Sequence, residues 1–67
     1  MGNTHYKLLV VFGANDIWTR KSLLRRLKDE NLIDDALSLG YIEQCGTTDI
    51  GEPQYRITNL GIQIRNN

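Results

Sequence analysis

The sequence has little of what disulfide frameworks and metal centres need. Its 67 residues include one cysteine, one histidine, one proline and one tryptophan. A lone Cys45 cannot close an internal disulfide, so we expect a reducing compartment and a cytoplasmic protein. His5 has no cysteine, histidine or acid close to it in the sequence. The sequence therefore predicts no metal centre and no cofactor.

Long apolar runs and a charge surplus are also missing. No run approaches the roughly 18 apolar residues of a membrane span, and Lys7–Phe12 is too short for a secretory signal. Eight basic and eight acidic residues cancel to a net charge of zero. This balance argues mildly against a strong nucleic-acid binder, because such proteins usually carry a basic surplus. The length allows one domain, over residues 1–67, with a small core.

The residues of a catalytic site are also lacking. A Cys45 nucleophile would need a base, and His5 is the one histidine available. The glycines form no phosphate-binding loop between a strand and a helix, and no pair of carboxylates suggests a hydrolytic acid and base. We therefore expect a protein that is not an enzyme.

The last third of the chain contains the clearest pattern. Two β-prone runs, Tyr41–Cys45 and Gln54–Thr58, flank a loop rich in glycine, aspartate and proline, which predicts a hairpin over residues 41–58. Alternation directs one set of side chains to the core: Ile42, Tyr55 and Ile57. The other set can face water: Glu43, Gln54 and Arg56.

Three helices are expected before the hairpin, over about residues 4–13, 20–28 and 32–39. Gly13 ends the first helix, and Thr19 suits the N-cap of the second. Asp29, Glu30 and Asn31 offer caps for the third, and Gly40 ends it. The leucines of the second helix form one apolar face: Leu23, Leu24 and Leu27. They should meet the apolar face of the third helix: Ile33, Ala36 and Leu37.

The second helix holds the one concentration of charge. Five of the eight basic residues lie between positions 20 and 28, and Lys21, Arg25 and Lys28 fall on one side of the helix. These cations could contact phosphates, or they could form a solvated face paired with nearby acids. The sequence leaves these two interpretations about equally supported. We assign the aromatic residues Tyr6, Trp18, Tyr41 and Tyr55 to the core rather than to base stacking.

Three segments together resemble a winged helix-turn-helix domain. W-T-R-K-S-L-L-R-R-L (18–27) resembles the strand and second helix, A-L-S-L-G-Y-I-E (36–43) the end of the third helix, and Y-R-I-T-N-L-G-I (55–62) the second wing strand. Similar segments occur in PadR-like and MarR-like transcriptional regulators. The resemblance implies an α+β fold with a three-helix core, a short strand at Ile17–Thr19 and a C-terminal β-hairpin wing. A short helix or a closing strand should follow the hairpin.

The resemblance also implies double-stranded DNA as the partner. Backbone contacts would then come from Thr19, Arg20, Lys21, Arg25 and Lys28. The third helix would offer Asn31, Asp34, Asp35 and Ser38 to the major groove. Aspartates there favour two other interpretations, which are helix capping and an acidic patch that meets the basic stripe of another copy or protein. We therefore expect a small DNA-binding regulator that acts as a homodimer or with a protein partner. The alternative is a protein-interaction module that does not bind DNA.

Overall fold

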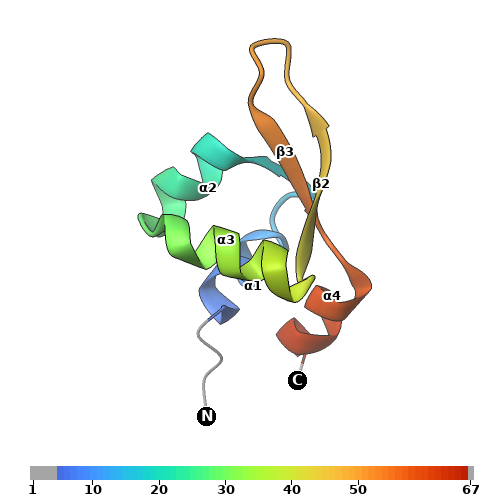
Figure 1. The fold of residues 1–67 in the computed structure, drawn as a ribbon. Coiled ribbons are helices and arrows are strands. Elements are labelled where there is room, and N and C mark those ends of the chain that lie inside the picture. The colour runs from blue at the N-terminus through green and yellow to red at the C-terminus, as the bar shows by residue number, and fades with distance from the viewer. Residues whose placement is uncertain (1–4, 67) are drawn as a thin grey trace.

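The chain folds into four helices and a three-stranded antiparallel sheet (Figure 1). The computed structural model describes residues 5–66. The elements in chain order are α1 (Tyr6–Val11), β1 (Ile17–Thr19), α2 (Arg20–Leu27), α3 (Glu30–Leu39), β2 (Ile42–Thr47), β3 (Pro53–Ile57) and α4 (Asn59–Asn66). The α+β class expected from the sequence is confirmed. The short strand expected at Ile17–Thr19 is present as β1, and a helix, α4, follows the hairpin. With β1 between two helices and paired to β3, the topology differs from a plain three-helix core with a hairpin.

The sheet has the order β1-β3-β2, so β3 is its central strand. Trp18 of β1 lies opposite Tyr55, and Ile42 of β2 lies opposite Ile57. The register of β2 shifts between Gln44 and Gly46, which makes Cys45 the extra residue of a β-bulge. The sequence pattern did not predict this bulge. It carries Cys45 to an exposed position.

The turn of the hairpin is shorter than expected. Gly46 and Thr47 belong to β2, and Pro53 is the first residue of β3, a position where its missing N–H is tolerated. Gly51 has a φ of 87°, a conformation that glycine adopts without steric cost. The loop is held by Thr48, whose N–H donates to the Glu52 carbonyl at 2.8 Å and whose hydroxyl accepts from the Glu52 N–H at 3.0 Å.

Local side-chain chemistry fixes the ends of α2 and α3. The Thr19 hydroxyl accepts from the Ser22 N–H at 3.2 Å, so the expected N-cap is confirmed. Asp29 caps α3 in the same way, accepting from the Asn31 N–H at 3.0 Å, and α3 therefore begins two residues before the expected position. Gly40, with a φ of 80°, ends α3 as predicted.

The first helix departs most from its expected bounds. It spans Tyr6–Val11, whereas residues 4–13 were expected, and residue 4 lies outside the described residues. Gly13 is not the C-cap: the helix ends at Val11 with Phe12 in the right-handed conformation, and Gly13 has no positive φ. Tyr6 is 52% exposed, so its assignment to the core was wrong. A helix this short turns one face inward, and Leu8 and Leu9 occupy that face.

The core lies between the helices and one face of the sheet. Its buried members are Leu8, Leu9, Phe12, Trp18, Leu23, Ile33, Ala36, Ile42 and Tyr55. Leu24, Leu27 and Leu37 are half-buried at its edge, so they contribute less than the sequence pattern suggested. Tyr41 is also half-buried, and its ring meets that of His5 edge-on with 5.4 Å between centroids.

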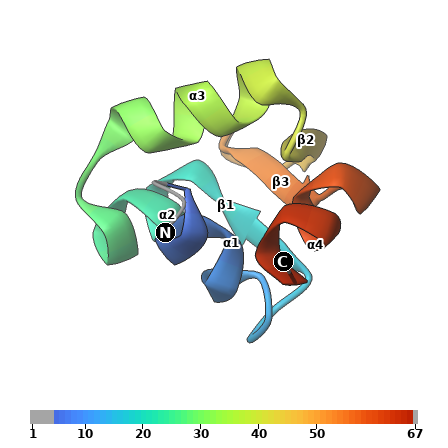
Figure 2. The same cartoon turned by 90° about the horizontal axis from the view of Figure 1, so that it is seen from below.

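A short hydrogen-bond network attaches α4 to the rest of the domain. Thr58 accepts from the Gly61 N–H at 3.1 Å, and its own hydroxyl is directed at the carbonyls of Gly40 and Tyr41. A Cβ on Gly61 would lie 2.1 Å from the Tyr41 carbonyl oxygen, so the approach of α4 requires glycine. Figure 2 shows α4 next to α1, with which it is in contact. The T-N-L-G part of the segment over residues 55–62 thus has a structural role.

Among the described residues, no helix has both the length and the apolar character needed to cross a membrane.

Candidate nucleic-acid interface

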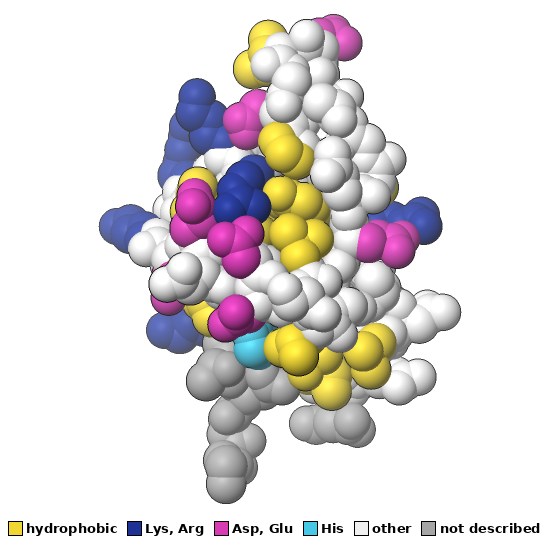
Figure 3. Space-filling view, viewed as in Figure 1, with side chains coloured by type: hydrophobic (Ala, Val, Ile, Leu, Met, Phe, Trp, Pro, Cys, Tyr) yellow, Lys and Arg dark blue, Asp and Glu magenta, His cyan; other side chains and the backbone are white. Residues whose placement is uncertain are grey.

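Three cations along α2 form the strongest candidate for contact with an anion. Lys21, Arg25 and Lys28 are exposed, and none takes part in an ion pair among residues 5–66. We call these three residues the basic edge. Lys28 has a φ of 58° and is the C-cap of α2, so this cation follows the helix rather than lying on it. Figure 3 shows Lys and Arg side chains along the side of the molecule formed by α2.

Arg20 does not belong to the basic edge, although the sequence grouped it with these residues. Its guanidinium donates to the Asp34 carboxylate at 2.9 Å and to the Tyr55 hydroxyl at 3.1 Å, and it lies 3.6 Å from Glu30. The hydrogen bond to Tyr55, followed by that to Asp34, raises the pKa of Arg20 above its usual value. Arg20 therefore joins α2, α3 and β3 and is not available for phosphate without losing these contacts.

The candidate Thr19, which caps α2, and Arg26, a further cation of α2, also have structural partners. The Thr19 hydroxyl caps the helix and donates to Ser22 Oγ at 2.9 Å. The Arg26 guanidinium lies 5.5 Å from the ring centroid of Trp18, within the range of a cation–π contact. The Trp18 indole N–H donates to the Asn15 carbonyl at 3.1 Å, and the ring is only 8% exposed, as expected for a core residue.

The outward side of α3 is exposed and acidic. The predicted groove-reading residues Asn31, Asp34, Asp35 and Ser38 all reach solvent. Asp34 is partly neutralised by Arg20, whereas Asp35 takes part in no ion pair among residues 5–66. In Figure 3, Asp and Glu side chains lie around a central Lys or Arg side chain on the face that α3 presents. The site residues predicted from sequence are thus divided between a basic side and an acidic side.

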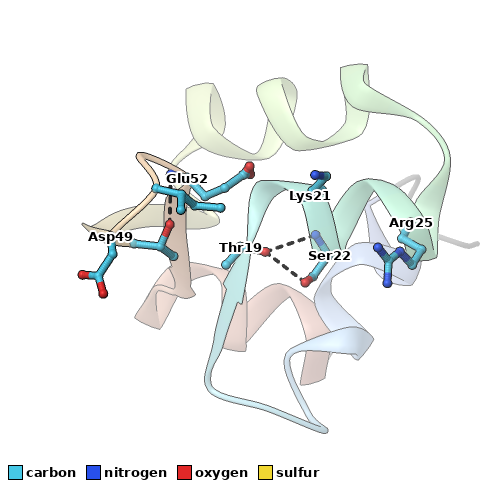
Figure 4. Close-up of a pocket in the computed structure, with 8 residues that line it drawn as sticks. Thr19, Lys21, Ser22, Arg25, Asp49 and Glu52 are labelled. Atoms are coloured by element: carbon cyan, nitrogen blue, oxygen red, sulfur yellow. Dashed lines mark hydrogen bonds between the residues drawn. The ribbon is translucent and has the colours of Figure 1, made fainter.

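A groove separates the start of α2 from the loop between β2 and β3. Its volume is about 380 Å³, and α2 contributes Lys21, Ser22 and Arg25 to one wall. The other wall is the loop, with Asp49, Ile50 and Glu52. Figure 4 shows the Glu52 side chain extending toward α2 and the Asp49 side chain pointing away from it. Sequence reasoning missed this juxtaposition, because about 25 residues separate the two walls along the chain and no local pattern links them.

A second groove lies between α1, α2 and the start of α3, and most of its lining residues are apolar. It has a volume of about 590 Å³ and is lined by Lys7, Val10, Val11, Ala14, Arg26, Leu27, Asp29 and Leu32. It shares no lining residue with the first groove. Within residues 5–66, no three His, Cys, Asp or Glu side chains are grouped closely enough to hold a metal ion.

A comparison of this chain with protein families, curated proteins and solved structures finds no match. The interpretation of the basic edge therefore depends on its own geometry and charge.

Proposed function

We propose that the chain is a winged-helix domain that docks on double-stranded DNA through the basic edge of α2. In this assignment α1, α2 and α3 are the three-helix core, α2 and α3 are the helix-turn-helix, and the β2–β3 hairpin is the wing. The domain would serve in transcriptional regulation or in a mobile-element process, and it would not be an enzyme.

The observation that carries this proposal is the exposure of three adjacent cations that have no acidic partner within the described chain. Lys21 and Arg25 lie on α2 and Lys28 follows them as its C-cap, while the acids nearest in sequence to the C-terminal end of α2 are used elsewhere. Asp29 caps α3, and Glu30 lies near Arg20. Exposed cations without an acidic partner can contact backbone phosphates, and such contacts fix a protein on a duplex without reading its sequence.

The acidic side of α3 limits what such binding can read. Asp35, Asn31 and Ser38 are exposed and could contact base edges, and aspartate can accept a hydrogen bond from cytosine N4. Carboxylates close to phosphates also cost electrostatic energy. We therefore propose that affinity comes from backbone contacts by the basic edge and that sequence preference is weak. Useful affinity then requires a dimer or a partner protein.

The salt dependence of binding to a labelled generic duplex tests this proposal. Three phosphate contacts give a slope of about −2.7 in a plot of log K against log salt, because each contact contributes about −0.9. Replacing Lys21 or Arg25 by glutamine should weaken binding and reduce the slope by about 0.9 in each case. Fluorescence anisotropy over a range of salt concentrations measures both quantities.

Lys7→Gln is the matched control, because Lys7 is an exposed cation on α1 that lines the other groove. This variant has the same net charge as Lys21→Gln and should bind DNA like the wild type. Equal losses for Lys7→Gln and Lys21→Gln would refute docking through the basic edge, since only the overall charge would then matter.

A second function, recognition of a protein, is favoured by the ion-pair arrangement on α3. Arg20 neutralises part of the charge of Asp34, whereas the neighbouring Asp35 is exposed. An acidic surface of this kind suits a basic partner protein better than it suits phosphates. In this case the wild type should bind no duplex at low salt. Asp35→Lys should then abolish capture of the partner, whereas Lys21→Gln should leave it intact.

A further inference from the structure

The groove between α2 and the β2–β3 loop carries both halves of a self-complementary surface. One wall presents the cations Lys21 and Arg25, and the other presents the carboxylates Asp49 and Glu52. None of these four groups forms an ion pair with another residue of the described chain. Glu52 extends toward α2 whereas Asp49 points away from it, and no ion pair forms across the groove within the described chain. Each wall could therefore pair with a matching wall of another molecule.

An exposed apolar side chain lies beside these charges. Ile50 occupies the tip of the hairpin and is 84% exposed, more than any other large hydrophobic side chain among residues 5–66. It lines the same groove. Its neighbour Asp49 points away from α2 of its own chain, as Figure 4 shows, so it is available to a second molecule.

We propose that two copies of this chain associate through this groove about a two-fold axis. About a two-fold axis every contact occurs twice. If a first residue of one copy contacts a second residue of the other copy, the second residue of the first copy also contacts the first residue of the other. The groove satisfies this requirement, because the loop of each copy would present Asp49 and Glu52 to Lys21 and Arg25 of the other copy. Ile50 of each loop would be covered by the groove of its partner, which removes an exposed apolar side chain from water.

The charge arrangement favours a second copy over an unrelated partner. Both complementary sets lie on one chain whose net charge is zero, so copies do not repel each other at long range.

The contact area is small, consisting of one loop and one side of α2. The dimer therefore belongs to the weak class that buries less than about 1,200 Å², and it should dissociate as salt rises. The proposal does not depend on DNA binding. A duplex bound at Lys21 and Arg25 would compete with this dimer, so it is not the dimer that would raise the affinity for DNA.

A charge-exchange experiment tests the interface by sedimentation velocity at low salt. One variant carries Lys21→Glu and Arg25→Glu, and the other carries Asp49→Lys and Glu52→Lys. Each variant alone brings like charges together across the two-fold axis, so its dissociation constant should rise by at least about tenfold relative to the wild type. An equimolar mixture should form a heterodimer, because both reciprocal contacts become complementary again.

A control pair separates this interface from general attraction between oppositely charged proteins. One control variant carries Lys7→Glu and Arg65→Glu, and the other carries Asp16→Lys and Asp35→Lys. These two variants have the same opposite net charges as the charge-exchanged pair, but the charges lie outside the groove. When these control variants are mixed, the fraction of dimer should not exceed that of the wild type at the same concentration. Circular dichroism establishes that each variant is folded, and Ile50→Ser should weaken the wild-type dimer without changing any charge.

Three results would overturn the proposal. The first is a wild type that stays monomeric at low salt and high concentration. The second is a charge-exchanged variant that still dimerises on its own. The third is an equimolar mixture of the two charge-exchanged variants that fails to form the heterodimer. DNA binding gives an independent readout. Asp49→Lys with Glu52→Lys leaves the basic edge intact and should bind a duplex at least as well as the wild type, so loss of the dimer and loss of DNA binding are distinguishable.

Discussion

Replacement of Gly61 by alanine should destabilise the domain, although alanine favours helices. Gly61 is buried in α4, and a Cβ there would lie 2.1 Å from the Tyr41 carbonyl oxygen and 2.8 Å from Ile57 Cγ1. The first neighbour is a backbone atom, so relief requires α4 or the start of β2 to move. Overpacking of this kind costs about 1–3 kcal/mol. Because the conflict is with backbone, we expect the upper end of that range.

Helix propensity partly offsets this cost. Alanine is favoured over glycine in a helix by about 1 kcal/mol, which leaves a net loss of about 2 kcal/mol. A chain of this length is stable by about 3–10 kcal/mol, so the loss is a large part of the total. The melting temperature should fall by about 8–16 °C, since each kcal/mol shifts it by about 4–8 °C in small domains.

Urea titration followed by circular dichroism measures the change in the free energy of unfolding. The control is Gln63→Ala, at an exposed position of the same helix, which should change stability by less than about 0.5 kcal/mol. If Gly61→Ala were as stable as the wild type or more stable, helix propensity would be the larger effect, and α4 would not pack against Tyr41.

Two further predictions concern the core and the start of α2. Leu23 is fully buried, so Leu23→Ala should lower the free energy of unfolding by about 2–5 kcal/mol. Leu24 is half-buried, so Leu24→Ala should lower it clearly less. Equal losses in urea titrations would contradict the observed helix face. Thr19→Ala should lower the stability by about 1 kcal/mol through loss of the N-cap, whereas Thr19→Ser should be nearly neutral. Thermal unfolding distinguishes the two variants, and equal melting temperatures would mean that the cap contributes nothing.

Features of the fold that depend on local chemistry were predictable from the sequence. Thr19 caps α2 and Gly40 ends α3 because each acts on neighbouring backbone groups. The alternation in β2 and β3 likewise predicted that Ile42 and Tyr55 would be buried. These predictions needed no knowledge of how distant segments meet.

Features that depend on distant contacts were not predictable. Arg20 was grouped with the phosphate contacts, but its partners Asp34 and Tyr55 are 14 and 35 residues away in the chain. The need for glycine at position 61 arises from the Tyr41 carbonyl, which comes close only when α4 folds back. The groove between α2 and the β2–β3 loop has the same origin. A pattern in one segment cannot report the charge or shape of another.

A two-dimensional NMR titration with a generic duplex tests the proposed DNA docking most directly. At low salt, shifts should cluster on α2, with Lys21, Arg25 and Lys28 leading, and they should disappear at high salt because phosphate contacts release counterions. The amides of α1 and α4 should move least. An unchanged spectrum at millimolar duplex, or shifts that persist at high salt, would contradict docking through the basic edge.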